Sequence, residues 1–267
     1  MDVVKIDGKH LEVCSLVGTS KYATDYHVCV VVCKASEKKE IMEAIYNRLD
    51  SLFGKNKPVT ISVHTDDMLP KFPKTEATVL SLNCKKRAHY ERIEEYFETV
   101  PIQKYIELVE MIPRLNKNSK FYKAEGLAIN NGGGETEDIL LNFKGKTAEI
   151  YRSVICDESI VRLLKKWKYG EEFHFLELLK IEPFEPKNVE RIHQELEIQT
   201  FPAGVKIPAF EYDNSYFYFS FFLLSAMKYI VREDGIVAYI TLDYGKLMFQ
   251  VKNFTEKEMV ESGFSIR

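Results

Sequence analysis

Two segments of this chain, residues 138–160 and 238–258, have nearly the same pattern, and this similarity constrains the fold more than any other feature. Each has an apolar run, a Gly-Lys pair at Gly145 or Gly245, a second apolar run and a polar stretch that can begin a helix. Glycine adopts the positive φ that tight hairpin turns require. We therefore predict a strand, a turn, a second strand and a helix in each segment, and a shorter hairpin at residues 3–17.

The rest of the chain contains both strand and helix patterns. Apolar residues at alternate positions predict strands, and apolar residues three and four apart predict helices. The predicted strands are residues 26–33, 59–63, 75–84 and 122–129, and the predicted helices begin near Ser36, Arg87, Pro101, Asp157, Glu171 and Val189. The strand–helix–strand order over residues 26–63 predicts a βαβ unit. The buried face predicted for the second similar segment consists of Ala238, Ile240, Leu242 and Tyr244.

These patterns predict an α+β fold with mixed or mainly antiparallel sheets, built of hairpins and flanked by helices. We expect two domains, because the polar run at residues 116–120 has the composition of a linker. Residues 1–116 would form an N-terminal α/β-type domain that contains the βαβ unit. Residues 117–267 would form a C-terminal α+β domain that contains the two similar hairpin–helix units.

Composition limits the class of protein. Of the 267 residues, 45% are hydrophobic and 29% are charged, and the formal net charge is -3. These values are typical of a soluble globular protein and argue against a positive field over the whole surface that would attract nucleic acid. The five cysteines are odd in number and fall mostly in apolar strand patterns. This usage favours reduced thiols and a cytoplasmic location.

The most apolar segment is residues 216–231, where Ser220, Ser225 and Lys228 interrupt a run rich in Phe and Tyr. A membrane-spanning helix needs about 20 apolar residues, so we expect a buried core element and no membrane anchor. The length of the segment favours a helix, whereas its aromatic content favours a strand, and both alternatives stay open.

A short segment near the N-terminus carries the most specific candidate for chemistry. Gly18-Thr19-Ser20 is followed by Asp25 and His27 at the start of a predicted strand. This arrangement resembles the nucleotidyltransferase pattern, in which a Gly-Ser turn precedes a strand with two acids one residue apart. The resemblance implies that Gly18 and Ser20 hold a nucleotide phosphate and that Asp25 holds Mg²⁺, a hard cation that prefers oxygen ligands. His27 stands where the family has its second acid, which puts the metal site in doubt.

The third acid of such a site would have to be Asp66 or Asp67, which follow the strand predicted at residues 59–63. In a parallel pair these two would lie at the opposite end from Asp25, and this geometry argues against the site. His64 with the two aspartates could also bind a metal, but Asp and Thr are ordinary turn residues. We therefore predict no metal site and no cofactor, with magnesium entering only under the nucleotide hypothesis.

Two basic clusters allow a nucleic-acid-binding factor as a further alternative. They are Lys165-Lys166-Trp167-Lys168-Tyr169 and Lys85-Lys86-Arg87-Ala88-His89. Lysines beside an aromatic ring can contact phosphate and stack on a base. Alternatively, Trp167 anchors a helix in the core while the lysines around it are solvated.

Motifs of the common catalytic sites, such as GxSxG, CxxC and GxGxxG, are absent from the sequence. We therefore expect a non-enzymatic protein that binds a protein partner or self-associates, with a dimer as the expected state. Aromatic anchors dominate protein interfaces. The candidate interface residues are Phe217, Tyr218, Phe219 and Trp167. The first alternative is a nucleotide-binding or degenerate nucleotidyltransferase-like enzyme that uses residues 18–27.

Overall fold

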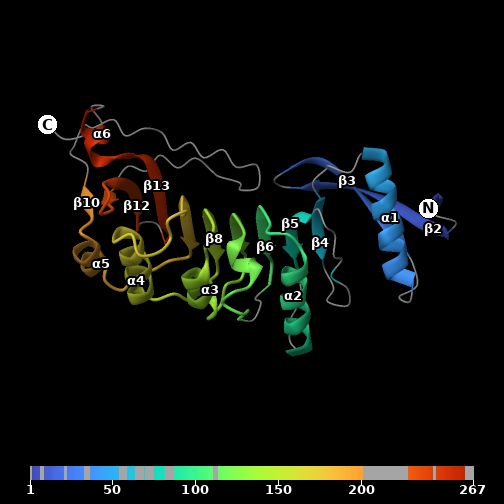
Figure 1. Cartoon of the computed structure of the whole chain (residues 1–267), viewed down its shortest axis with the longest axis horizontal. Coiled ribbons are helices and arrows are strands. Elements are labelled where there is room, and N and C mark those ends of the chain that lie inside the picture. The colour runs from blue at the N-terminus through green and yellow to red at the C-terminus, as the bar shows by residue number, and fades with distance from the viewer. Residues whose placement is uncertain are drawn as a thin grey trace. The chain divides into compact units, whose positions relative to one another are not determined.

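The computed structural model describes most of the chain and confirms the α+β class (Figure 1). The described residues are 2–6, 9–20, 23–32, 37–53, 59–63, 69, 75–81, 87–110, 114–200, 228–242 and 245–261, with the backbone alone described over residues 2–32. Two compact units make up this part of the chain. Among its helices, none is long and apolar enough to cross a membrane.

The first unit contains a three-stranded antiparallel sheet and one long helix. Its elements are β1 (Asp2–Ile6), β2 (Lys9–Ser20), β3 (Ala23–Val32) and α1 (Lys38–Phe53). The sheet order is β1-β2-β3, and Ile6 pairs with Lys9 across the first turn. The predicted hairpin at residues 3–17, the strand near residue 26 and the helix after Ser36 are therefore confirmed.

The second unit contains a ten-stranded mixed sheet. Its strands are β4 (Val59–Val63), β5 (Thr75–Leu80), β6 (Tyr105–Leu108), β7 (Gly126–Ile129), β8 (Thr147–Tyr151), β9 (Leu178–Glu182), β10 (Gln199–Thr200), β11 (Lys228–Val231), β12 (Ile236–Thr241) and β13 (Leu247–Thr255). They are arranged in the order β10-β11-β12-β13-β9-β8-β7-β6-β5-β4. Neighbouring strands from β5 to β9 pair in parallel. In the rest of the sheet, β9-β13-β12-β11-β10, every neighbouring pair is antiparallel.

Each parallel strand lies beside the next one in the sequence, and a helical crossover joins the two. The crossovers contain α2 (Arg87–Thr99), the 3-10 helix η2 (Lys120–Lys123), α3 (Thr136–Asn142) and α4 (Asp157–Lys168). Two more helices follow, α5 (Val189–Leu196) and α6 (Glu256–Glu261). Figure 1 shows α2 to α5 following one another in the same order as the strands. This regular stacking of strand and helix is the arrangement of an α/β solenoid.

One face of the sheet packs against the helices. Its residues share a register row that runs Thr78, Ile106, Leu127, Ala148, Leu179 and Phe249, and each of them is at most 1% exposed. At one end of the row, the Oγ1 of Thr78 forms a hydrogen bond of 2.7 Å with the Oη of Tyr96 on α2. At the other end, the ring of Phe249 meets Trp167 of α4 edge to face, with 4.9 Å between ring centroids. The apolar core of the unit therefore lies between this row and the helical layer.

The two similar segments do not have similar structures. Residues 238–258 form the predicted hairpin, in which β12 pairs with β13 and Gly245 has a φ of +70°. In residues 138–160 the first predicted strand belongs instead to helix α3, so that hairpin and the internal duplication are wrong. The physical reason is that β7 and β8 are parallel, and parallel neighbours need a crossover where antiparallel ones need only a turn.

Gly145 meets a different need from Gly245. A Cβ at Gly145 would lie 2.0 Å from the carbonyl oxygen of Ala124 and 2.5 Å from the ring of Phe143. This glycine therefore allows two backbone segments to approach closely, whereas Gly245 supplies the left-handed conformation of a hairpin turn.

Several other expectations need correction. The helix predicted after Pro101 is strand β6, and the helix predicted from Glu171 gives way to strand β9. Strands β3 and β4 lie in different sheets, so residues 26–63 do not form the predicted βαβ unit. The cause in the first two cases is that these strands have only four and five residues, and in so short an apolar run periodicity does not separate a strand from a helix.

The prediction for β12 places buried residues on one face of the strand, whereas residues on both faces are buried. Ala238, Ile240 and Leu242 are buried, but so are Tyr239 and Thr241 on the opposite face. A central strand in a large sheet has neighbours on both faces, which explains the difference. Tyr244, the fourth member of the predicted set, lies outside the described residues.

Strands β6 and β7 lie on either side of residues 116–117, where the sequence pattern places a domain boundary. They pair in parallel, with Tyr105 opposite Gly126. The linker-like run between them ends at η2, where the side chain of Ser119 accepts a hydrogen bond from the backbone N–H of Phe121.

Candidate functional site

Most residues of the nucleotide hypothesis lie where side chains are not described. Gly18 and Ser20 end β2, opposite the start of β3, where Gly18 pairs with Tyr26 and Ser20 with Ala23. Asp25 and His27 lie on β3, so the register brings the glycine–serine pair and these two residues to the same end of the hairpin. Asp66 and Asp67 lie outside the described residues, as do the interface candidates Phe217, Tyr218 and Phe219.

The fourth interface candidate, Trp167, lies in the core of the second unit. It is completely buried, and besides Phe249 it contacts Arg232, whose guanidinium carbon lies 5.2 Å from the ring centroid. This is the position expected of a core anchor.

The lysines around Trp167 are paired with glutamates. The Nζ atoms of Lys165, Lys166 and Lys168 lie 2.9, 2.8 and 2.6 Å from the carboxylates of Glu195, Glu172 and Glu197, respectively. These pairs offset the positive charge of the cluster that the sequence offers to nucleic acid. Of the second basic cluster, Lys85 and Lys86 lie outside the described residues.

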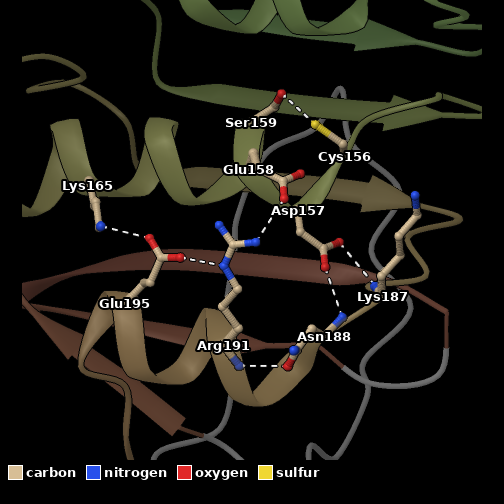
Figure 2. Close-up of polar contacts among 9 residues, drawn as sticks. All are labelled: Cys156, Asp157, Glu158, Ser159, Lys165, Lys187, Asn188, Arg191 and Glu195. Atoms are coloured by element: carbon tan, nitrogen blue, oxygen red, sulfur yellow. Dashed lines mark hydrogen bonds and ion pairs between the residues drawn. The ribbon is translucent and has the colours of Figure 1, made fainter.

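A chain of polar contacts joins helices α4 and α5 (Figure 2). Asp157 accepts hydrogen bonds from the backbone N–H groups of Lys187 at 3.2 Å and Asn188 at 2.9 Å. Asn188 in turn caps α5 by accepting from the N–H of Arg191 at 2.9 Å. These contacts fix the start of α5 against the start of α4.

The same chain continues through charged side chains. Arg191 donates to Glu158 at 3.0 Å and to Glu195 at 2.7 Å, and Lys165 also donates to Glu195. Hydrogen bonds from Lys165 and Arg191 lower the pKa of Glu195. Because these groups satisfy one another, we interpret the α4–α5 contacts as structural.

The second face of the ten-stranded sheet carries a different set of side chains. Its central row, set by the register, runs Val79, Glu107, Ala128, Glu149, Lys180 and Met248. Successive strand residues point to opposite faces, so this row lies on the side away from Phe249 and the helical layer. We call this side the polar face. The polar-face cluster consists of Tyr105, Glu107, Asn130, Glu149, Tyr151, Lys180 and Glu182.

Hydrogen bonds connect the cluster across strands. Tyr151 donates to the Oε2 of Glu149 at 2.5 Å, and Lys180 donates to the Oη of Tyr151 at 3.1 Å. Lys180 also forms an ion pair with Glu182 at 3.3 Å, and its Nζ lies 4.8 Å from the centroid of the Tyr151 ring. On the other side of β7, Asn130 donates to the Oε1 of Glu107 at 2.8 Å.

Glu149 is the most unusual member of the cluster. Glu149 is 4% exposed, and the Oε1 of its carboxylate has no hydrogen-bond partner among the described residues. Burial raises the pKa of Glu149, and the negative charges of Glu107 and Glu182 act in the same direction. The hydrogen bond from Tyr151 and the charge of Lys180 oppose this effect without overcoming it.

The two tyrosines remain protonated and act as donors. Burial raises the pKa of Tyr105, and the charges of Glu107 and Glu149 raise it further. Burial also raises the pKa of Tyr151, as does its hydrogen bond to Glu149. The cluster contains three carboxyl groups, those of Glu107, Glu149 and Glu182, and one ammonium group, that of Lys180, so it has an excess of hydrogen-bond acceptors. Within the described part of the chain, no three His, Cys, Asp or Glu residues are placed to hold a metal ion.

Sequence reasoning missed the polar-face cluster, although its strands share a local signal. A charged residue stands between apolar ones in Ile106-Glu107-Leu108, in Ala148-Glu149-Ile150 and in Leu179-Lys180-Ile181.

No protein-family model matches this chain, and no curated protein sequence or solved structure matches it either.

Proposed function

We propose that this chain is a non-enzymatic interaction protein that binds a protein partner, or a second copy of itself, through the polar face of the ten-stranded sheet. The observation that supports this proposal is the polar-face cluster: charged and aromatic side chains from β6 to β9 stand in register on the side away from the helices.

The composition of the cluster suits a protein partner. Tyrosine is enriched among the residues that dominate binding energy, and charged groups in register give an interface its specificity. A stack of parallel strands offers an extended surface, which is how solenoid proteins bind other proteins. Parts of the cluster reach the surface: the side chain of Glu182 is 44% exposed, and Glu107, Asn130 and Tyr151 are half-buried.

Two charge reversals, one on the polar face of the sheet and one on a helix, test the proposal. Glu107→Arg changes the polar face, and Glu190→Arg makes the same change at an exposed position on α5. We expect cross-linking followed by affinity purification of the full chain to recover a partner with the wild type and with Glu190→Arg, but not with Glu107→Arg. Recovery of the same partners by all three proteins would contradict the proposal.

If the partner is a second copy of the chain, the molar masses of the same two variants in solution test the proposal. Multi-angle light scattering should then give a dimer for the wild type and for Glu190→Arg, and a monomer for Glu107→Arg. A dimer that persists in Glu107→Arg would place the self-association surface elsewhere.

A further inference from the structure

Strand β11 carries a lysine in the register row that otherwise belongs to the apolar core. Beyond Phe249 this row continues through Ile240 of β12 to Lys228 of β11, so Lys228 lies on the side of the sheet that faces the helices. Its side chain reaches α5, where the Nζ of Lys228 lies 3.2 Å from the Nε2 and 3.4 Å from the Nδ1 of His193. The register therefore places a positive charge on the helical side of the sheet, next to the edge strand β10.

A hollow with a volume of about 620 Å³ lies beside this contact. The described residues that line it come from the start of α5 and from β11, and they are Lys187, Asn188, Val189, Glu190, His193 and Lys228. Lys187 is exposed, and His193 and Lys228 are half-buried. The hollow is therefore open to solvent, and its deeper wall is formed by the pair of Lys228 and His193.

The two lysines of the hollow have no carboxylate partner among the described residues. On α4, in contrast, Lys165 and Lys166 each form an ion pair with a glutamate. Of the described residues that line the hollow, only Glu190 carries a negative charge, against the ammonium groups of Lys187 and Lys228. Positive groups that line a concave surface focus the electrostatic field there and raise the local concentration of anions.

Both lysines keep hydrogen-bond donors for a ligand. An ammonium group has three N–H donors, and a neutral imidazole accepts at one nitrogen alone, so His193 uses one donor of Lys228. No acceptor among the described residues takes the side-chain donors of Lys187. The backbone N–H groups of Lys187 and Asn188 already donate to Asp157, so they do not contribute. The ligand of the hollow must therefore supply acceptors and negative charge to the two ammonium groups.

We propose that this hollow binds a phosphate group through the side chains of Lys187 and Lys228. A phosphate carries nearly two negative charges at neutral pH, which balance the two ammonium groups, and its oxygens are strong acceptors. The volume of the hollow lies within the range of about 300 to 1,000 Å³ that ligand pockets have, so a phosphate ester fits as well as the free ion. The site lies on the helical side of the sheet and does not depend on the function proposed for the polar face.

A nuclear magnetic resonance titration of the ¹⁵N-labelled full chain tests the proposal. The probes are inorganic phosphate and methyl phosphate, and the control is acetate at the same ionic strength. We expect both phosphates to bind at about 1 mM, which ligands of so few atoms can reach, and to shift the amide signals of Lys187, Asn188 and Lys228. Acetate should bind at least about tenfold more weakly, because it carries one charge. No saturable shift at these amides with either phosphate, or equal binding of acetate, would overturn the proposal.

Three variants locate the site. Lys228→Gln should weaken the binding of inorganic phosphate by about tenfold, and Lys187→Gln, at an exposed side chain, by about threefold. Lys117→Gln removes an exposed lysine that does not line the hollow, and it should leave binding unchanged. The circular dichroism of each variant checks its fold, and if Lys228→Gln does not fold, Lys187→Gln decides the question. Unchanged binding in Lys228→Gln, or in Lys187→Gln as its substitute, overturns the site.

Discussion

Replacement of Glu149 by glutamine should change how the stability of this protein depends on pH. Glu149 is buried with one carboxylate oxygen unpaired, and burial raises its pKa above the value in the unfolded chain. As pH rises above the ordinary pKa of a glutamate, the unfolded state loses this proton while the folded state still holds it. The free energy of unfolding of the wild type therefore falls across this interval, and it levels off above the pKa of the folded state.

Glutamine has no proton to lose, so the variant lacks this decline. We expect Glu149→Gln to gain stability relative to the wild type as pH rises above the ordinary pKa of a glutamate, about 4.3, by about 1 to 3 kcal/mol, which is the penalty for leaving a buried polar group unpaired. The buried amide of the introduced glutamine lowers the free energy of unfolding by an amount that does not depend on pH. The prediction therefore concerns how the difference in free energy of unfolding between variant and wild type changes with pH. Lys180 keeps its ion pair with Glu182, so the substitution does not leave that ammonium group without a partner.

Urea denaturation at a series of pH values measures the effect, since urea does not screen charges as guanidinium chloride does. Glu190→Gln, at an exposed position on α5, controls for the removal of one negative charge. A difference between wild type and Glu149→Gln that stays constant with pH would refute the reasoning. It would mean that the carboxylate is either solvated or paired in the folded protein.

Four further substitutions test the packing of the second unit. Trp167→Ala should lower the free energy of unfolding by about 3 to 5 kcal/mol in urea denaturation, because the ring is completely buried against Phe249. Its control is Tyr169→Ala, at a residue that is 41% exposed. A loss under about 1 kcal/mol for Trp167→Ala would contradict the core position. Gly145→Ala should cost about 3 kcal/mol, since the new Cβ meets the carbonyl of Ala124 at 2.0 Å. Gly245→Ala meets nothing within 4 Å and should cost only about 1 kcal/mol for its φ of +70°, so equal costs from thermal melts would count against these contacts. Asp157→Ala should cost about 1 to 2 kcal/mol and speed hydrogen exchange at Lys187 and Asn188, and unchanged exchange there would argue against the anchoring role.

Elements with complete local signals were predictable from the sequence. The strand Val59–Val63 has alternating residues and is confirmed with its predicted bounds, and the helix Arg87–Thr99 has an apolar stripe and begins at the predicted residue. The turn at Asp234-Gly235 also follows its local sequence, because Gly235 has a φ of +88° between β11 and β12. In each case, residues within a few positions of one another determine the conformation.

The segment 138–160 shows where local signals fail. Its residues alternate well enough for a strand, yet Ile139 and Leu140 are both buried on helix α3. An apolar run of this length fits a short helix or a strand equally well, and periodicity does not separate them. What decides is that β7 and β8 are parallel neighbours, a property of the whole sheet that no residue in the segment encodes.

The candidate site depends on the register of four strands, which explains why sequence reasoning did not find it. Glu107, Glu149 and Lys180 are far apart in the sequence, and they form one row only when β6 to β9 pair with the observed partners. The charges themselves help to fix that pairing. A shift of β8 by one residue would move Glu149 into the position of Ala148, which is completely buried against the helical layer. An unpaired carboxylate there would be far costlier than on the polar face, where Tyr151 donates to it. The charged residues of β6, β8 and β9 therefore help to select the register, and this register places Glu107, Glu149 and Lys180 in one row on the polar face.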